Sequence, residues 1–333
     1  MEENLQDKIK KIYSEKSIKH HNEIENKKKK LYEKYPEIYE KEREINNLAI
    51  ENTKKIIFAP DDEKIKIEKD TEINIKKIRR EIKQIYKENN IPLNYLEPTY
   101  DCKFCKDTGN IEENGEIKKC KCYKQLIILE AFKSSNLNKI KTENFKTFDS
   151  SYYSDESNVE KYGSNISPRK NIEKIKESVE NFIENFDNIK ESGILFSGKP
   201  GLGKTFMSNC IARELLLRGY TVLYQTAPTL LDTIIKYKFS KNSDEAEKIY
   251  SDIYSVDLLI IDDAGTENMN NQRHEELFEL INARLLNNKK TIISTNLSID
   301  ELYINYDERV ISRILGGYKK YKFYGEDIRL KKI

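Results

Sequence analysis

Residues 198–205 read Gly-Lys-Pro-Gly-Leu-Gly-Lys-Thr, which matches the pattern G-x-x-x-x-G-K-[S/T] at every position. An apolar run at 194–197 precedes this octapeptide, and a stretch with helical character at 205–217 follows it. A strand, a glycine-rich turn and a helix in this order are typical of a loop that binds nucleotide phosphates. The glycines allow backbone N–H groups to curl around phosphate oxygens, and the helix N-terminus attracts anions. We therefore predict a nucleotide site formed by Gly198, Lys199, Pro200, Gly201, Leu202, Gly203, Lys204 and Thr205.

Two side chains of this loop have specific expected roles. Lys204 is predicted to place its positive charge on the β- and γ-phosphates of ATP. The hydroxyl group of Thr205 is predicted to bind Mg²⁺. The loop thus indicates ATP and Mg²⁺ as cofactors.

The sequence around the loop indicates an α/β domain. From about residue 168 onward, helical patterns alternate with short apolar runs at 194–197, 221–224, 258–261 and 291–294. Apolar runs of this length, spaced by helices, are typical of buried parallel strands. We expect residues 168–333 to form a nucleotide-binding domain around a parallel sheet.

Polar side chains follow two of these predicted strands. Asp262 and Asp263 end the apolar run that starts at 257, and Asn296 ends the next. In phosphate-loop enzymes such an acid holds the Mg²⁺ shell, which suits Asp262, while Asp263 is placed to polarise the attacking water. Asp263 is one methylene group shorter than the Glu that many such enzymes carry here, so we expect weak hydrolysis. Asn296 is predicted to orient water and to sense the γ-phosphate.

Three arginines near the C-terminus are further candidates. Arg309 and Arg313 lie four residues apart, on one face of a predicted helix, and Arg329 follows in the segment 325–329. An arginine can stabilise phosphate charge within its own subunit or from a neighbouring one. Surface ion pairs with nearby acidic residues are the alternative for each.

Four of the five cysteines fall within 21 residues: Cys102, Cys105, Cys120 and Cys122. Two close pairs of thiolates suit tetrahedral Zn²⁺ with no open coordination position. We predict a zinc module at 98–125. An iron–sulfur cluster is the competing assignment, because it also takes four cysteines. Cys210 lies in the helix that follows the phosphate loop and is expected to be a core residue.

The N-terminal part, residues 1–97, has apolar residues at helical spacing, interrupted by Pro36 and Pro60. It is therefore predicted to form several helices rather than one rod. A module that binds a partner and a solvated helical bundle without such a role remain equally open. The polar segment 126–167, which contains Phe145 and Phe148, is expected to be a linker.

Composition excludes some classes of function. Charged residues make up 35% of the chain but nearly cancel, with a formal net charge of +2, so any surface for nucleic acid must be local. No stretch approaches the roughly 20 apolar residues of a membrane helix, and the charged N-terminus has no apolar signal core. We expect a cytoplasmic protein without a membrane partner.

The motifs together resemble the DnaC/DnaI-type replicative helicase loaders and, more distantly, the IstB transposition ATPases. The resemblance spans about residues 98–333 and rests on the order of the motifs. These are Tyr100–Gly109 with Cys120 and Cys122, Phe145 and Phe148, the phosphate loop, Leu258–Gly265, Ser294–Asn296, Glu308–Arg313 and Gly325–Arg329.

The resemblance implies an AAA+ core and an N-terminal region that binds a DnaB-type replicative helicase. It implies ATP-dependent self-association and contact with single-stranded DNA. Lys236 and Lys238 are candidates for this contact, and a solvated helix face is the alternative for them. It also implies that Asn296 is the first sensor, Arg313 the finger that reaches the next subunit and Arg329 the second sensor, with Arg309 as the rival finger.

The leading hypothesis is an ATP-dependent helicase loader. An IstB-like transposition ATPase is one alternative, and a nucleotide-gated adaptor with negligible hydrolysis is another, which the short side chain of Asp263 keeps open. The zinc module and the long helical N-terminal part favour the loader, because they suggest a dedicated protein partner.

Overall fold

The computed structural model describes residues 5–131, 142–239 and 244–331. Part of the predicted linker, residues 132–141, lies outside the described residues. By internal contacts the chain divides into two compact units, 1–111 and 112–333. Among the described residues, no helix is both long enough and apolar enough to cross a membrane.

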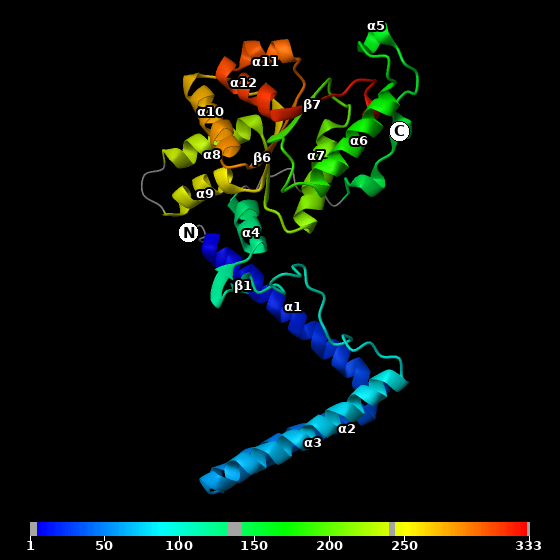
Figure 1. Cartoon of the computed structure of the whole chain (residues 1–333), viewed down its shortest axis with the longest axis vertical. Coiled ribbons are helices and arrows are strands. Elements are labelled where there is room, and N and C mark those ends of the chain that lie inside the picture. The colour runs from blue at the N-terminus through cyan, green and yellow to red at the C-terminus, as the bar shows by residue number, and fades with distance from the viewer. Residues whose placement is uncertain (1–4, 132–141, 240–243, 332–333) are drawn as a thin grey trace. The chain divides into compact units, whose positions relative to one another are not determined.

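The first unit contains three long helices, α1 (Leu5–Lys34), α2 (Pro36–Phe58) and α3 (Asp61–Glu88) (Figure 1). The predicted breaks are confirmed, because α2 begins at Pro36 and Pro60 is the N-cap of α3. Leu31, Ile38 and Tyr86 form a small buried cluster where the three helices meet. A short hairpin, β1 (Asn110–Glu113) and β2 (Glu116–Lys119), follows along the chain.

The second unit is a mixed α/β domain, as predicted. Its five parallel strands lie in the order β4-β5-β6-β3-β7. Their bounds are β3 (Gly193–Ser197), β4 (Val222–Thr226), β5 (Leu258–Ala264), β6 (Lys290–Thr295) and β7 (Tyr318–Lys322). The four predicted strands are confirmed to within two residues at either end, except that β5 continues three residues further.

Helices cover this sheet in the second unit (Figure 1). They are α4 (Lys121–Ala131), α6 (Pro168–Glu184), α7 (Lys204–Leu217), α8 (Ala227–Lys238), α9 (Asp244–Ser255), α10 (Asn271–Leu286), α11 (Ile299–Asn305) and α12 (Glu308–Gly317). Shorter elements are α5 (Val159–Tyr162), η2 (Phe145–Thr147), η3 (Ser150–Tyr152) and η4 (Ile328–Lys331). The order of the strands brings the carboxyl ends of β3, β5 and β6 side by side.

The core of this domain reaches into the segment that precedes it. Tyr153 is buried in the main apolar cluster, and Phe145 and Phe148 pack against it. In addition, Gln125 of α4 exchanges two hydrogen bonds with the backbone of Val222, at 2.7 and 2.9 Å. Residues on the N-terminal side of α6 therefore contribute to the packing of the nucleotide-binding domain.

Candidate functional site

The phosphate loop connects β3 to α7, as its sequence predicts. Gly198 has φ +142°, and a Cβ atom there would lie 2.2 Å from the carbonyl oxygen of Phe323. Gly203, the N-cap of α7, has φ +92°, and its Cβ would lie 2.5 Å from the hydroxyl oxygen of Tyr153. That hydroxyl group donates a hydrogen bond to Leu202 O at 2.9 Å. Both glycines are thus required by their backbone conformation and by the close approach of a neighbour.

A cavity of about 340 Å³ opens over this loop. Residues 200–205 line it, together with Asp263, Asn296 and Arg329. Strand ends far apart in the sequence therefore meet at one site. Glu143, Phe206 and Ile328 also line the cavity and were not predicted.

Lys204 is held at the floor of the site. Its ammonium group donates to Gly198 O at 2.6 Å, Lys199 O at 2.9 Å and Asn296 Oδ1 at 2.9 Å. The residue is only 6% exposed, and burial lowers the pKa of Lys204 to about 8. The hydrogen bond to Asn296 directly connects two residues that were predicted to contact the same phosphate.

ATP binding should weaken as the pH rises above about 8. Phosphate contact favours the charged form of Lys204 and raises its pKa above the value of about 8 in the free protein. Above that pH, binding must take up a proton, so affinity should fall by up to about tenfold per pH unit. Below about pH 8 Lys204 is already charged, so the affinity should not depend on pH through this group. Titrations with ATP at a series of pH values above and below about 8 measure this dependence. Lys204→Arg stays charged and should bind ATP without the fall in affinity above about pH 8, and an equal fall in that variant would contradict the assignment.

Asp262 is the buried acid of the site, with 3% exposure. Thr205 Oγ1 donates to its Oδ2 at 3.1 Å, and the hydroxyl group of Tyr224 donates to the same oxygen at 2.8 Å. Ser294 donates to the other oxygen. Burial, and then the charge of Asp262, raises the pKa of Tyr224 well above its usual value. Tyr224 and Ser294 were not predicted, because they lie inside strands.

The pair formed by Thr205 and Asp262 suits Mg²⁺. A hydroxyl oxygen and a carboxylate oxygen 3.1 Å apart are hard ligands of the kind that Mg²⁺ takes together with substrate phosphates. These two residues would hold the ion, which would supply positive charge to the phosphates. Their position beside Lys204 places the predicted ion next to the phosphate loop.

Asp263 faces the cavity from a strained backbone position. Its φ is +53°, a conformation that favours glycine. Burial raises the pKa of Asp263, and the adjacent charge of Asp262 raises it further. The carboxylate is therefore directed into the site but is a weaker acid than usual, a property that suits proton transfer.

The three arginines are separated by the structure. Arg329 lines the cavity and forms an ion pair with Asp327 at 2.6 Å. Arg309 and Arg313 lie on α12 and do not line this cavity; both stack on the ring of Phe278, at 4.8 and 4.4 Å from its centroid. Arg313 also donates to Asn282 Oδ1 at 2.8 Å. Of these three arginines, Arg329 is the one that lines the cavity.

The four clustered cysteines form a candidate metal centre. The sulfur atoms of Cys102, Cys105, Cys120 and Cys122 all lie within 4.8 Å of one another. Tetrahedral Zn²⁺ with Zn–S bonds of about 2.3 Å requires sulfurs about 3.8 Å apart. The donor set therefore fits zinc. In addition, Gly109 N donates to Cys105 Sγ at 3.3 Å, an orientation of the kind that supports metal thiolates.

Asp107 supports this segment and was not assigned a role from the sequence. Its carboxylate accepts hydrogen bonds from the backbone N–H groups of Asp101 and Cys102, both at 2.8 Å. His20 and Lys16 of α1 lie 3.3 and 3.7 Å from the same carboxylate. Asp107 thus fixes the backbone at the first cysteine and ties it to α1.

Purified protein should contain about one Zn²⁺ per chain, because a closed four-thiolate site binds zinc tightly. Cys105→Ser should lose this zinc and destabilise the module while leaving ATP binding largely intact. Elemental analysis and a nucleotide titration measure the two effects. Cys210→Ala is the matched control, because Cys210 lies in the core of α7, and it should keep the zinc. Iron, or no metal under reducing conditions, would contradict the prediction.

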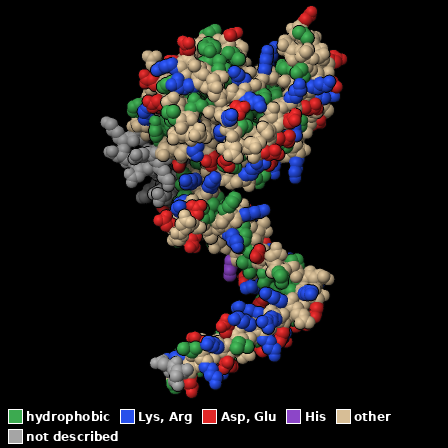
Figure 2. All heavy atoms as spheres, viewed as in Figure 1, with side chains coloured by type: hydrophobic (Ala, Val, Ile, Leu, Met, Phe, Trp, Pro, Cys, Tyr) green, Lys and Arg blue, Asp and Glu red, His purple; other side chains and the backbone are tan. Residues whose placement is uncertain are grey.

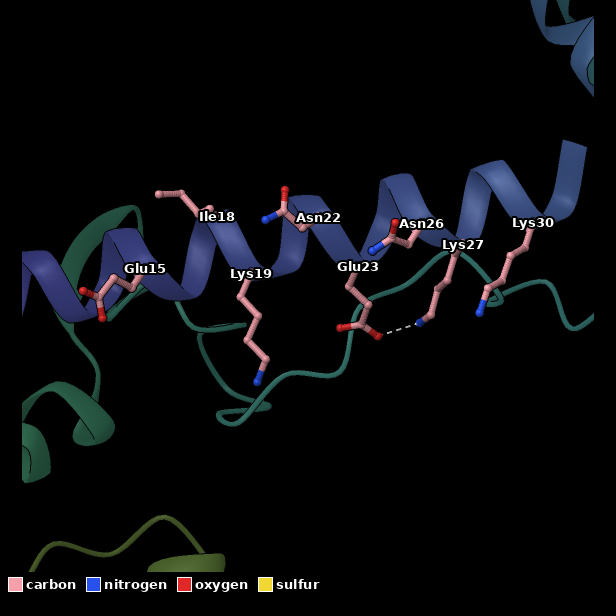
Figure 3. A pocket seen from close by; sticks show the side chains of 8 residues that line it. All are labelled: Glu15, Ile18, Lys19, Asn22, Glu23, Asn26, Lys27 and Lys30. Atoms are coloured by element: carbon pink, nitrogen blue, oxygen red, sulfur yellow. Dashed lines mark ion pairs between the residues drawn. The ribbon is translucent and has the colours of Figure 1, made fainter.

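A second hollow lies along α1 (Figure 3). Eight side chains of this one helix line it, and they include Lys19, Glu23 and Lys27. Glu23 and Lys27 form an ion pair at 2.8 Å and also bond to Thr99 and Glu97. Two of the charged residues on this surface thus bind the segment 97–99 of the same chain, and the surface brings no catalytic groups together.

The chain is similar to known proteins over part of its length. Replicative helicase loader DnaC of Escherichia coli strain K12 is 31% identical over 147 residues, which cover 44% of this chain and 59% of that protein. DnaC of Buchnera aphidicola subsp. Baizongia pistaciae is 30% identical over 158 residues, which cover 47% and 62%. The chain thus spans about 60% of the length of these two relatives.

Solved structures that resemble the chain include the DnaC helicase loader and DnaI. The first has a TM-score of 0.44 at 21% identity and covers 56% of this chain and 99% of the other. The second has a TM-score of 0.43 at 22% identity and covers 58% and 93%.

The profile of one protein family, described as IstB-like ATP binding protein, matches residues 141–332. This segment is more than half of the chain and contains the phosphate loop, the acidic strand end, Asn296 and the three arginines. It also begins just before Glu143 and Phe145, so it includes the segment that packs on the nucleotide-binding core. The chain belongs to the family of IstB-like ATP binding proteins.

Proposed function

We propose that the chain is an ATP-dependent loader of a DnaB-type replicative helicase onto single-stranded DNA. The observation that carries this proposal is the identity of 31% to replicative helicase loader DnaC across 147 residues. The cavity over the phosphate loop supports it, because it supplies the groups that an ATP-controlled protein requires.

Each group at the site has a proposed role. Lys204 neutralises the β- and γ-phosphates, while Thr205 and Asp262 hold Mg²⁺. Asp263 orients and deprotonates the attacking water, and Asn296, which contacts Lys204, reports whether the γ-phosphate is bound. Arg329 lies at the cavity of its own subunit and acts as the second sensor.

Hydrolysis is proposed to be weak and stimulated by a partner. The side chain of Asp263 is short, and its raised pKa reflects burial next to Asp262. These two features also support the alternative of a nucleotide-gated adaptor with negligible hydrolysis. A measurement of ATP turnover with and without the helicase separates the two.

The proposed partners are the helicase, single-stranded DNA and further copies of this chain. The helical region, residues 1–97, is proposed to bind the helicase. Lys238 is a weak candidate for contact with DNA, because its charge is paired with Glu276 at 2.7 Å and with Glu279 at 3.0 Å. Figure 2 shows basic and acidic side chains interspersed on the visible face of the nucleotide-binding unit. DNA contact is therefore proposed to require the assembled loader, in which several copies add their charges.

Co-purification of the full chain with the replicative helicase of its host, with and without ATP, tests the proposal. We expect a stable complex whose amount changes with ATP, and no ATP effect with Lys204→Ala. Recovery of a transposase with no helicase would support the IstB-like transposition alternative. Absence of helicase binding under both conditions would overturn the loader proposal.

A further inference from the structure

The loop that follows β5 is tied to itself by short hydrogen bonds. Thr266 Oγ1 donates to Asp263 O at 2.8 Å, and Gly265 N donates to Glu267 Oε2 at 2.9 Å. Glu267 therefore holds the backbone two residues after Asp263, whose own backbone is in the left-handed region with φ +53°. A movement of Asp263 would be transmitted to Glu267 through this closed loop.

The same loop is fixed to the end of β6. Thr295 Oγ1 donates to Ala264 O at 2.6 Å. Gly265 has φ +97°, and a Cβ atom there would lie 2.3 Å from Leu297 Cδ1. Asn296, which contacts Lys204, lies between these two contact residues. The loop thus connects to both polar strand ends that face the nucleotide cavity.

Glu267 is a buried carboxylate, with 8% exposure. Its second oxygen, Oε1, accepts a hydrogen bond from the hydroxyl group of Tyr306. In the described part of the chain, no basic side chain forms an ion pair with it. Burial, and then the charge of Glu267, raises the pKa of Tyr306, so the hydroxyl group keeps its proton and remains a donor. Burying a carboxylate without a basic partner costs folding free energy. We therefore expect Glu267 to have a role in the function of the protein and not in its stability.

Tyr306 lies at the joint between two helices. It is the C-cap of α11, and the next residue, Asp307, is the N-cap of α12, where its side chain accepts from Arg309 N at 2.8 Å. Arg309 and Arg313 both project from α12 onto Phe278. Tyr306 is therefore directly adjacent to the residue at which the arginine-bearing helix begins.

We propose that Glu267 is a positioning residue that couples the loop after β5 to the arginine-bearing helix α12 through the hydroxyl group of Tyr306. This inference rests on the proposed ATP-dependent function. When the groups at the cavity respond to a bound phosphate, Glu267 passes the change to the start of α12. The state of one nucleotide site then alters the arginines that α12 presents to its surroundings.

Hydrogen exchange of residues 308–317, with and without ATP and Mg²⁺, tests the coupling. In the unmodified chain we expect ATP to change the exchange of this segment. Tyr306→Phe should bind ATP within about twofold of the unmodified chain, lose most of the change in exchange, and hydrolyse ATP about tenfold more slowly, as expected for one missing hydrogen bond. Tyr303→Phe, on α11 and half-exposed, is the matched control and should behave like the unmodified chain.

Two further variants separate coupling from folding. Glu267→Gln can keep both hydrogen bonds, with the Tyr306 hydroxyl group as acceptor, and should retain the ATP-dependent change. Glu267→Gln/Tyr306→Phe breaks the link without leaving a buried charge unpaired, and should lose the change even if Tyr306→Phe alone does not fold. A normal change in exchange in the folded double variant, or no change in an unmodified chain that binds ATP, would overturn the coupling. Failure of the unmodified chain to bind ATP would instead overturn the proposed function.

Discussion

Lys204→Ala should weaken ATP binding by about 100-fold or more, because it removes a charge that contacts two phosphates. Hydrogen bonds to charged groups contribute about 1.5–3 kcal/mol, and 2.7 kcal/mol corresponds to roughly a 100-fold change in affinity. The three oxygen acceptors of the ammonium group, Gly198 O, Lys199 O and Asn296 Oδ1, would also lose this hydrogen-bond donor. Titration with a fluorescent ATP analogue in the presence of Mg²⁺ measures the loss.

Lys199→Ala is the matched control for this experiment. Lys199 belongs to the same loop, but its side chain is exposed, and it is its backbone carbonyl group that contacts Lys204. We expect a much smaller loss of affinity for this variant. Thermal unfolding of both variants checks that the fold is retained. Undiminished ATP affinity in folded Lys204→Ala protein would refute the assignment of the phosphate loop.

The sheet could be predicted where the strands are buried on both faces. β3, β4, β5 and β6 are buried along most of their length and each contains a short apolar run, which is the pattern of parallel strands covered by helices on both faces. β7 was missed because it reads Tyr-Lys-Lys-Tyr-Lys and lies at the edge, where it pairs only with β3. An edge strand with exposed lysines has no apolar signal, and the same lysines keep it from pairing with another chain.

The site could be predicted in part for a similar reason. Asp262 and Asn296 come directly after apolar runs of the sequence, 258–261 and 291–294 with Thr295, so their position at one edge of the sheet follows from the parallel order. Tyr224 and Ser294 lie within strands, and nothing in their spacing distinguishes them from core residues. Only the pairing of β4, β5 and β6 shows that both reach Asp262. Glu143 was missed because the segment before α6 was expected to be a linker, and Phe206 was missed because it lies in α7, just after the last residue of the phosphate-loop motif.

In the cysteine module the metal ligands could be predicted from the sequence, but the residue that supports them could not. The four ligands were recognisable from spacing alone, but the role of Asp107 required its hydrogen bonds to two backbone N–H groups. Lys106 and Asp107 also have positive φ values, +48° and +58°, which bend the chain toward Gly109. The sequence around the ligands thus supplies the supporting contacts of the proposed zinc site.

We expect the ATP site to be shared between subunits. In this structure Arg313 does not line the cavity of its own chain; it stacks on Phe278 and donates to Asn282 Oδ1 and to Arg309 O. We therefore predict that Arg313 contacts the nucleotide of a neighbouring copy and not that of its own chain. Arg329, by contrast, lines its own cavity. The two arginines should therefore give different results when they are replaced.

Arg313→Ala should leave ATP binding by isolated subunits nearly unchanged but reduce hydrolysis by about 10³-fold, the effect of losing an arginine supplied by a neighbour. Mixing this variant with Lys204→Ala protein provides the decisive measurement. Each variant damages a different half of the shared site, so some mixed interfaces regain both halves and part of the turnover should return. If mixing restores nothing while the unmodified protein is active, or if Arg313→Ala alone abolishes nucleotide binding, Arg313 acts within its own chain. The role of finger then passes to Arg309, which also stacks on Phe278, or no such finger is needed.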